Sequence, residues 1–505
     1  MPVPPEVLYM DKRIKLIALG LVFCFLLLFL QLNNIQIIQE KSLRYKSTNV
    51  YDDITQNVLD LPRGEILTSD GTVIAESKPS HDAYGYQRIY PKGSLFADIT
   101  GYFDVVDGSI QYGVESVYNN YLETHVTAGG SPGKLISQQT GTDSIVLTIN
   151  AKLQKIAEQA LGGRVGAVVA IDPVNGDILA LYANPTYNPN VLASHNASFV
   201  QEEAKKLEDL SDPAASPLID GATQLTYPPG STFKIVTTST IYDYDPHLAA
   251  ISYPFLPQLS LPDSNVPLHN FDNEVCGGSL ALALAVSCDT TYSQIGLDLG
   301  GNLMYKQAKR FGFDQVPPID LPGATPSVFP SPSTISPPFL AYSAIGQGNV
   351  RESALQDAMV IAAVANGGKL MTPHVLGRVI GPDGQIVYTY HPHMWLRATT
   401  PATAAAVREL MLGVTENPAG TAATQTWPTG VQVAAKTGTA QNGTNACIDD
   451  WLVATAPAGN KEVPKVAVAA VVSGASAGVV CDGTGAAVAG PVVSTVLTAA
   501  LKEGL

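Results

Sequence analysis

The sequence predicts an α+β protein with one N-terminal transmembrane helix, a β-rich pedestal domain and a larger domain whose antiparallel sheet is covered by helices. Three observations support this prediction. A long run without charged residues opens the chain, turn-and-strand patterns follow it, and strand-like and helix-like runs then alternate to the end. We expect the three segments to comprise residues 1–39, 40–142 and 143–505.

The first segment contains a candidate membrane helix. No charged residue occurs between Leu16 and Gln39, and a helix of this length spans about 36 Å, enough to cross a hydrocarbon layer of about 30 Å. Because Lys12, Arg13 and Lys15 precede the run, the positive-inside rule places the N-terminus in the cytoplasm. A cleavable signal peptide would end at small residues, which this run lacks. We therefore expect a retained single-pass anchor in the cell membrane, with the remaining chain extracytoplasmic.

The composition excludes some classes of partner. The 505 residues are 46% hydrophobic and 14% charged, and the formal net charge is −15. Because a nucleic-acid-binding protein would present a basic face, we expect no nucleic-acid partner. No cofactor motif occurs, and the pair His391 and His393 lacks a clustered third ligand, so we expect neither a cofactor nor a metal.

Four cysteines follow the apolar run, and an exported chain would carry them into an oxidising compartment. They are Cys276, Cys288, Cys447 and Cys481. Three pairings are possible, and the local pairs Cys276–Cys288 and Cys447–Cys481 are favoured because each closes a loop within one sequence neighbourhood. Free buried thiols are the alternative.

The second segment has the pattern of short strands and turns. Asp70-Gly71 separates two alternating runs, which is typical of a hairpin. No combination of residues with catalytic chemistry occurs there, so the segment is expected to be a stalk or docking module.

The third segment begins with a strand over 143–149 and a helix that opens at Asn150, followed by a hairpin over 166–185. Near its end come three strand-like runs that would pair antiparallel, and a terminal helix that can cover one sheet face. These runs are 432–441, 449–459 and 464–475, and the helix is 491–505.

The candidate nucleophile is Ser231, which stands three residues before Lys234 in the sequence YPPGSTFKIV. At i and i+3 of a helix the two side chains share a face, and a serine nucleophile needs a neighbouring base. Burial or a nearby cation can lower the pKa of a lysine enough for that role. A second match, Ser131 and Lys134, lies in a Gly/Pro-rich loop that holds no fixed geometry.

Two further motifs indicate that Ser231 and Lys234 form a catalytic pair and not a chance match. Ser287-Cys288-Asp289 follows Ser231, and Lys436-Thr437-Gly438-Thr439 follows on a predicted strand. Ser-x-x-Lys, Ser-x-(Asn/Asp) and Lys-Thr-Gly in this order form the motif set of the penicilloyl serine transferases.

The resemblance extends beyond these motifs, and the chain is similar to class B penicillin-binding proteins, which are membrane-anchored D,D-transpeptidases of peptidoglycan synthesis. RGEILTSDGTVIA and YGVESVYNNYL resemble motifs of the family's pedestal, and residues 146–190 resemble the start of its transpeptidase domain. SAIGQGNVRESALQDAMVIAAVANGGKLMTPHVL resembles the stretch between the second and third motifs. The match runs over about residues 60–500 and is most like the actinobacterial penicillin-binding protein A group.

The resemblance implies a role for each motif residue. Ser231 would attack the penultimate D-Ala carbonyl of a stem peptide, with Lys234 as base and Ser287 relaying the proton to the leaving amine. Lys436 would hold the substrate carboxylate and lower the pKa of Lys234. The strand would bind the peptide through Thr437 and Thr439, with Gly438 leaving room for it. The backbone N–H groups of Ser231 and Thr439 would form the oxyanion hole.

One position departs from the family pattern, because Asp289 stands where Asn is usual. An ionised Asp only accepts hydrogen bonds, and its charge would raise the pKa of Lys234 and weaken that base. The resemblance implies acylation by penicillin and other β-lactams, and this departure brings the acylation rate into question.

Several alternatives stay open beside a transpeptidase of cell-wall synthesis, cell shape and division. A D,D-carboxypeptidase shares the acylation chemistry, and a weakly acylating scaffold would share the fold. A β-lactamase would need a deacylating carboxylate, and a β-lactam sensor would need a larger cytoplasmic part. If the chain builds wall, a separate polytopic glycosyltransferase is the expected partner, contacted through the anchor and pedestal.

Overall fold

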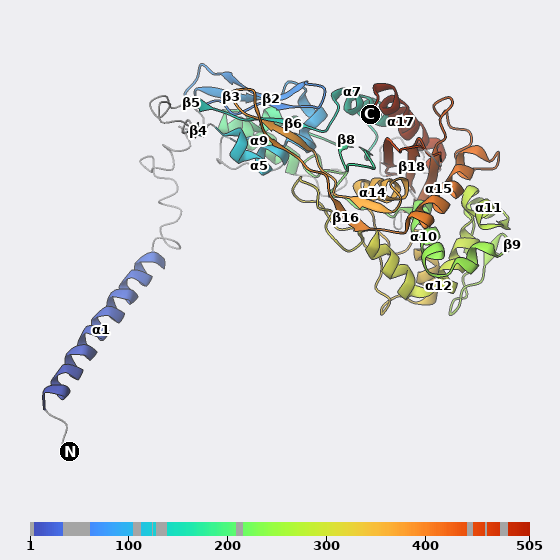
Figure 1. Cartoon of the computed structure of the whole chain (residues 1–505), viewed down its shortest axis with the longest axis horizontal. Coiled ribbons are helices and arrows are strands. Elements are labelled where there is room, and N and C mark those ends of the chain that lie inside the picture. The colour runs from blue at the N-terminus through green and yellow to red at the C-terminus, as the bar shows by residue number, and fades with distance from the viewer. Residues whose placement is uncertain are drawn as a thin grey trace. The chain divides into compact units, whose positions relative to one another are not determined.

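The protein is described by a computed structural model that covers residues 5–33, 61–104, 113–123, 125–127, 139–208, 216–441, 448–459, 462–474 and 483–505. The chain divides into two compact units (Figure 1). The first comprises residues 1–61 and 81–85, and the second comprises residues 62–80 and 86–505.

The first unit contains one long helix, α1 (Pro5–Asn33). The expected membrane helix over Leu16–Gln39 coincides with α1 as far as Asn33, and residues 34–39 lie outside the described residues. Among the residues that the structure describes, no helix is both long enough and apolar enough to cross a membrane.

A six-stranded sheet in the second unit joins strands from distant parts of the chain. Its order is β15-β14-β6-β1-β2-β3, with β1 (Ile66–Leu67) antiparallel to β2 and parallel to β6. The hairpin expected at Asp70-Gly71 is confirmed, because β1 and β2 pair on either side of it. The sheet includes strands from both sides of the expected boundary at 142/143. The other members are β2 (Val73–Pro79), β3 (Tyr86–Ile89), β6 (Ser144–Leu147), β14 (Leu376–Ile380) and β15 (Ile386–Thr389).

A five-stranded antiparallel sheet forms the centre of the larger domain, in the order β17-β18-β19-β7-β8. The three strands expected late in the chain are confirmed, as is the hairpin expected over 166–185. The strands are β17 (Ala434–Gln441), β18 (Ile448–Ala456), β19 (Val466–Val472), β7 (Gly166–Ile171) and β8 (Ile178–Asn184). Because β17 lies at the edge, one side of its backbone is available to groups other than a strand.

Helices cover both faces of this sheet. Every residue of β19 is buried, so neither of its faces is open to solvent. On one side α17 (Gly490–Glu503) packs against the sheet and against α7 (Ala151–Leu161), and on the other side α14 (Ala354–Ala365) packs against β19, β7 and β18. The start predicted for α7 is confirmed, because the Asn150 side chain accepts a hydrogen bond from the Leu153 N–H at 3.0 Å.

The helix α10 (Lys234–Tyr244) packs against α12 (Asp289–Arg310), α14 and α15 (Pro401–Glu416). Two shorter helices pack around this group, α11 (Leu280–Ala285) against α15 and α13 (Pro337–Ser343) against α12. The order of these elements confirms the expected α+β class, in which helices between the first and last strands cover a sheet.

Candidate active site

The candidate nucleophile lies in a tight turn that leads into a buried helix. Residues Gly230–Phe233 form a 3₁₀ turn, and α10 continues from Lys234. The backbone of Gly230 has a φ of 56°, and a Cβ at this position would lie 2.8 Å from the Thr439 carbonyl oxygen. A side chain would therefore separate the turn from β17. The turn places half-buried Ser231 beside the edge strand of the central sheet.

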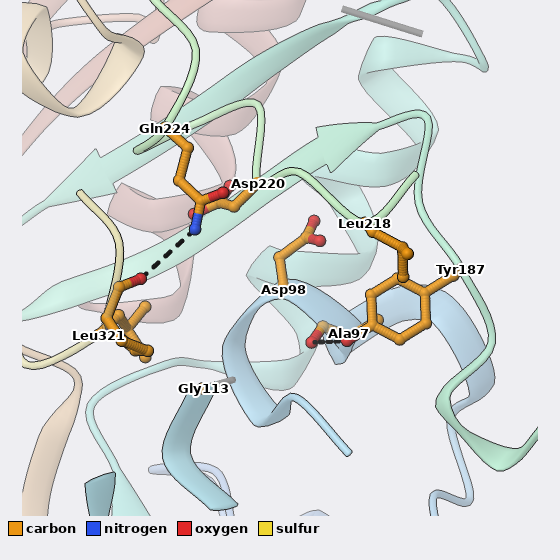
Figure 2. A pocket seen from close by; sticks show the side chains of 9 residues that line it. Ala97, Asp98, Gly113, Tyr187, Leu218, Asp220, Gln224 and Leu321 are labelled. Atoms are coloured by element: carbon orange, nitrogen blue, oxygen red, sulfur yellow. Dashed lines mark hydrogen bonds between the residues drawn. The ribbon is translucent and has the colours of Figure 1, made fainter. Parts of the chain in front are cut away.

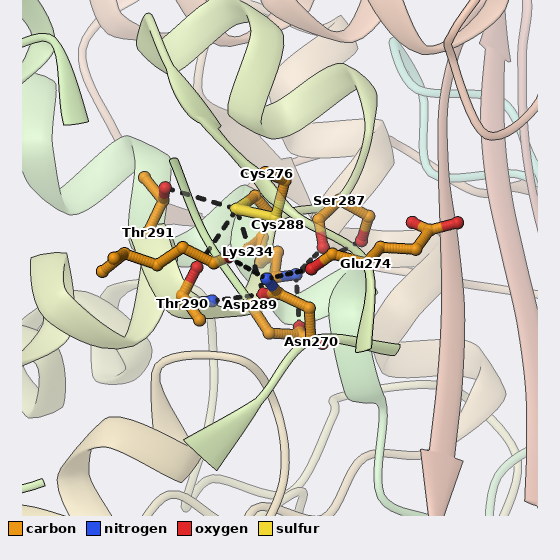
Figure 3. Close-up of a disulfide and its surroundings, with 10 residues drawn as sticks. Lys234, Asn270, Glu274, Cys276, Ser287, Cys288, Asp289, Thr290 and Thr291 are labelled. Atoms are coloured by element: carbon orange, nitrogen blue, oxygen red, sulfur yellow. Dashed lines mark hydrogen bonds and ion pairs between the residues drawn. A yellow bond between two sulfur atoms is a disulfide. The ribbon is translucent and has the colours of Figure 1, made fainter. Parts of the chain in front are cut away.

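Lys234 is the centre of the polar contacts around the turn (Figure 3). Its side chain is wholly buried, and Nζ donates to the Ser287 carbonyl oxygen at 2.6 Å and to Ser287 Oγ at 3.2 Å. Nζ also forms an ion pair with Asp289 Oδ1 at 2.7 Å and lies 5.5 Å from the centroid of the Tyr292 ring. In this arrangement the amine is held by the second motif.

Ser287 connects the two lysines predicted from the sequence. Lys436 Nζ donates to Ser287 Oγ at 2.8 Å and to the Thr437 carbonyl oxygen at 2.8 Å. Ser287 has a φ of 61°, an unusual conformation for a residue with a side chain. The serine follows α11 and precedes α12, and the strained turn between these helices presents its hydroxyl to both amines.

Burial is the largest cause of the perturbed lysine pKa values. It lowers the pKa of Lys234, although the Asp289 carboxylate acts in the opposite direction. Burial also lowers the pKa of Lys436 well below its ordinary value, and repulsion from Lys234 lowers it further. The resemblance implied that Lys436 lowers the pKa of Lys234. This stays a prediction, because repulsion between two ammonium groups acts on both of them.

Asp289 shifts the pKa of Lys234 in the predicted direction. Its charge and its hydrogen bond both raise that pKa. These effects are smaller than that of burial, so the pKa of Lys234 remains lowered. The expected weakening of the base is therefore partial. A lysine with a lowered pKa can give up its proton more readily and act as a base near neutral pH.

The strand motif contacts the turn closely but not in the way expected for Gly438. A Cβ at Gly438 would lie 2.6 Å from the Pro229 carbonyl oxygen and 2.9 Å from Trp451 Cβ. This glycine is thus required by the approach of the nucleophile turn, in addition to any approach of a peptide. Trp451 Nε1 donates to the Pro228 carbonyl oxygen at 3.0 Å, which fixes the same segment.

The two threonines of the motif are partly engaged within the protein. The Thr437 hydroxyl is hydrogen-bonded to the Thr421 hydroxyl at 2.7 Å, and Thr439 Oγ1 accepts from the Gly485 N–H at 3.1 Å. Gln347 Nε2 approaches the Thr439 carbonyl oxygen at 3.4 Å. Both hydroxyls keep capacity for further hydrogen bonds, since a hydroxyl has one donor and two acceptor sites and each uses one of them here.

A disulfide holds the second motif. Cys276 and Cys288 are joined, which confirms one of the two favoured pairings, and Cys288 stands between Ser287 and Asp289. The Thr290 N–H donates to Asn270 Oδ1 at 2.9 Å, so the start of α12 is tied both covalently and by a hydrogen bond (Figure 3). Ser131, Lys134, Cys447 and Cys481 lie outside the described residues.

Sequence reasoning missed several residues that shape this site, because their contacts join distant segments. Tyr292 receives the Lys234 amine over its ring, and its hydroxyl is 2.8 Å from that of Thr238. Gly346 accepts from the Gly230 N–H at 2.9 Å. Gly346 belongs to the stretch 343–376, which resembles the family. The resemblance assigned no function to any single residue of this stretch.

A separate cavity carries none of the candidate catalytic residues (Figure 2). Two of its lining side chains, Asp98 and Asp220, are carboxyl groups whose pKa values are raised by burial, to about 6 for Asp220, and repulsion from Asp220 raises that of Asp98 further. Asp220 Oδ1 accepts from the Ala222 N–H at 2.8 Å, so this carboxyl group has a role in the local turn.

Comparisons with known proteins match both parts of the second unit. The model of the penicillin binding protein transpeptidase domain matches residues 166–498, and that of the penicillin binding protein A dimerisation domain matches residues 63–131. Peptidoglycan D,D-transpeptidase PbpA of Mycolicibacterium smegmatis is 33% identical over 525 residues, covering 98% of this chain and 100% of the relative. PbpA of Mycobacterium tuberculosis is 32% identical over 523 residues, covering 98% of this chain and 99% of the relative.

Solved structures match the fold over most of its length. Penicillin-binding protein A from M. tuberculosis, as a ceftriaxone acyl-enzyme, has a TM-score of 0.77 at 32% identity and covers 88% of this chain and 100% of that chain. The penicillin G acyl-enzyme of the same protein has a TM-score of 0.75 at 32% identity, covering 87% and 99%.

Proposed function

Because the chain belongs to the penicillin-binding protein transpeptidase family and is a serine-type peptidoglycan D,D-transpeptidase, we propose that Ser231 is its nucleophile and that stem peptides and β-lactams acylate this serine. The observation that carries this proposal is the convergence of all three motifs on one buried polar cluster, in which Ser287 Oγ lies 3.2 Å from Lys234 Nζ and 2.8 Å from Lys436 Nζ.

The acylation step follows from these contacts. Ser231 Oγ forms a bond to the penultimate D-Ala carbonyl carbon, and neutral Lys234 takes the hydroxyl proton. When the tetrahedral intermediate collapses, the C–N bond breaks and the proton passes through Ser287 to the leaving D-Ala amine. An amine of a second stem peptide then attacks the ester, Ser231 regains its proton, and the cross-link is formed.

Charge is stabilised at two places during this step. The terminal carboxylate of the substrate binds near Lys436. It also accepts hydrogen bonds from the hydroxyl groups of Thr437 and Thr439. The oxyanion is bound by the backbone N–H groups of Ser231 and Thr439, because β17 is an edge strand whose outer side faces the nucleophile turn. Removal of one such donor typically lowers the rate about 10²–10³-fold.

Covalent labelling tests the nucleophile. The full-length chain is exposed to fluorescent penicillin beside Ser231→Ala and the matched Ser131→Ala. We expect labelling to survive the loss of Ser131 and to disappear with the loss of Ser231. A folded wild-type protein that takes up no label would overturn the proposal. Incubation with a stem peptide and an amine acceptor then separates cross-linking from release of D-Ala alone, which would identify a carboxypeptidase.

We also propose that residues 16–39 anchor the chain in the cell membrane with the N-terminus in the cytoplasm. The charge-free run and the preceding Lys12, Arg13 and Lys15 support this, as does the exposure of apolar α1 side chains such as Leu16, at 74%. Extraction of membranes with alkaline carbonate tests the anchor, and release of the intact chain would contradict it.

A polytopic peptidoglycan glycosyltransferase is the proposed partner of the anchor and the pedestal. The expected pedestal segment carries no candidate catalytic residue, which supports a docking role for it. Co-purification from membranes is compared between the wild-type chain and a variant whose residues 16–39 are replaced by an unrelated membrane helix. Equal recovery of the partner would show that this anchor sequence has no part in the contact.

A further inference from the structure

Two buried carboxyl groups lie at the start of α14, outside the cluster described above. Glu352 and Asp357 are each 1% exposed. Among the described residues, neither oxygen of Asp357 has a hydrogen-bond partner, and the same holds for Glu352 Oε1. A buried carboxyl group without partners is costly when it is charged, so each group favours its protonated form.

Glu352 is joined directly to the segment that carries the nucleophile. Its N–H donates to the Tyr227 carbonyl oxygen at 2.8 Å, and the Tyr227 N–H donates to the Glu352 carbonyl oxygen at 2.9 Å. Tyr227 stands four residues before Ser231, and the intervening Pro228 and Gly230 are held by Trp451 and Gly346. A shift of the Glu352 backbone would therefore reach the turn through two hydrogen bonds.

Asp357 is linked to the same turn through Thr232. Thr232 follows Ser231 in the chain and is wholly buried. Burial raises the pKa of Asp357, and the Thr232 hydroxyl acts in the opposite direction. In the structure this hydroxyl donates its hydrogen bond to the Pro229 carbonyl oxygen at 3.1 Å. An Asp357 carboxylate would compete with Pro229 for this hydroxyl, because an ionised carboxylate is the stronger acceptor.

The two carboxyl groups titrate together. Burial raises the pKa of both, to about 7 for Asp357, and repulsion from Asp357 raises that of Glu352 further. The pair therefore loses its first proton near neutral pH. The folded protein holds this proton at pH values where an unfolded carboxyl group has lost it. Stability from the pair is thus greatest in acid and is lost as the pH rises through about 7.

Other titratable groups around α14 act on different partners. β7 and β19 carry none. On the remaining elements, the shift at Lys234 comes from burial and Asp289, that at Asp450 comes from burial and Asp449, and Arg408 donates to the Ala365 carbonyl oxygen. Lys369 of β13 (Lys369–Met371) and Glu409 of α15 are both exposed. The charge closest in effect to Asp357 is therefore that of Glu352.

We propose that Glu352 and Asp357 form a positioning pair for Ser231, whose protonated form keeps the nucleophile turn in its reactive geometry and whose ionisation slows acylation. The pair does not touch the substrate. Ionisation of Asp357 places an unpaired negative charge near Thr232. This charge repels the oxyanion that develops at the turn. It also draws the Thr232 hydroxyl away from the Pro229 carbonyl oxygen. The inference rests on acylation of Ser231.

The test is the pH profile of acylation by penicillin G, measured on the full-length chain from pH 5.5 to 9 as a second-order rate constant. In the wild type we expect the rate to fall above pH 7, by up to about tenfold per pH unit, as the neutral form is lost. We expect Asp357→Asn, which cannot ionise, to abolish this fall while its rate at pH 6 stays within about threefold of wild type. Rates are normalised to the folded fraction.

Asp450→Asn is the matched control. Burial and Asp449 also raise the pKa of Asp450 to about 7, and Asp450 lies opposite Thr439 in the register of β17 and β18. A falling limb that disappears in Asp450→Asn but persists in Asp357→Asn would overturn the proposal. A wild-type profile without any fall up to pH 9 would also overturn it, and this arm needs no variant to fold. Complete absence of acylation at every pH would instead refute the assignment of Ser231.

Discussion

Replacement of Asp289 by Asn separates the two influences on the candidate base. Lys234 Nζ and Asp289 Oδ1 are 2.7 Å apart, and the Asp289 side chain is only 18% exposed. Unit charges at this distance attract by about 6 kcal/mol before desolvation, at an effective dielectric constant of about 20. In proteins an adjacent opposite charge shifts a pKa by about 1–3 units. We therefore expect Asp289→Asn to lower the pKa of Lys234 further by about this amount.

The consequence for catalysis is a larger fraction of neutral Lys234. The fraction rises about tenfold for each unit by which the pKa falls, for as long as the pKa exceeds the pH of the assay. The rate constant for acylation by penicillin is therefore expected to be at least as large in Asp289→Asn as in wild type at pH 7. Its rising limb on the acid side should move to lower pH by about 1–3 units.

The assay is the pH dependence of acylation, with Asp298→Asn as the matched control. Asp298 lies on the same helix, is exposed, and accepts a hydrogen bond from Gln294, so its replacement removes the same charge away from the site and should leave the limb in place. A large drop in the rate of folded Asp289→Asn would refute the reasoning, because it would show that the carboxylate itself takes part in acylation. A limb that moves to higher pH would refute it equally.

Two further predictions concern packing and a buried ion pair. Gly438→Ala places a Cβ 2.6 Å from the Pro229 carbonyl oxygen, so the turn must shift. We expect the rate of penicillin acylation to fall about tenfold or more, because a misplacement of about 1 Å can cost about 10² in rate. Glu115→Ala removes the carboxylate that Arg63 and Arg88 contact at 2.9 and 2.6 Å. The two buried guanidinium groups then lose this counter-charge, which should reduce the free energy of unfolding by about 3–5 kcal/mol.

Controls distinguish these two effects from general loss of structure. Gly413→Ala on α15 meets only Ala285 Cβ, at 3.6 Å, so a comparable loss of acylation there would contradict the steric explanation for Gly438. For Glu115, burial raises the pKa, but Arg88 and Arg63 outweigh it and hold the pKa below its ordinary value. The stability it supplies is therefore present above the ordinary carboxyl pKa and lost in acid, and a variant as stable as wild type in urea at pH 7 would contradict the prediction.

The sequence was sufficient for features that depend on local pattern. Asn150 predicted the start of α7 through its side-chain oxygen, and the late strands were recognised by runs of Val and Ala. The resemblance that the motifs support implied roles for Ser287 and Lys436 beside Lys234, and in the structure both lysine amines donate to Ser287 Oγ. These predictions needed no knowledge of how distant segments pack.

Features that depend on tertiary contacts were not predictable in the same way. The sheet that joins β1 with β14 crosses a boundary that composition suggested, since a parallel or long-range pairing leaves no local signal. The steric need for Gly438 arises from Pro229, which lies on a separate segment. Asp357 resembles an ordinary acidic residue in the first turn of a helix, and only the burial of that turn makes it a titrating group of interest.

The balance of charge in the site explains how two buried lysines can coexist there. Asp289 can neutralise one ammonium group, and its 2.7 Å contact goes to Lys234. Among the described residues, the hydrogen-bond partners of Lys436 are uncharged oxygens of Ser287 and Thr437, and its pKa is the more strongly lowered. With both lysines charged, the site lacks one negative charge, and we expect the terminal carboxylate of a stem peptide or the carboxylate of a β-lactam to supply it. We expect that anion to favour the charged form of Lys436, whose charge in turn favours neutral Lys234 at the moment when Ser231 must lose its proton.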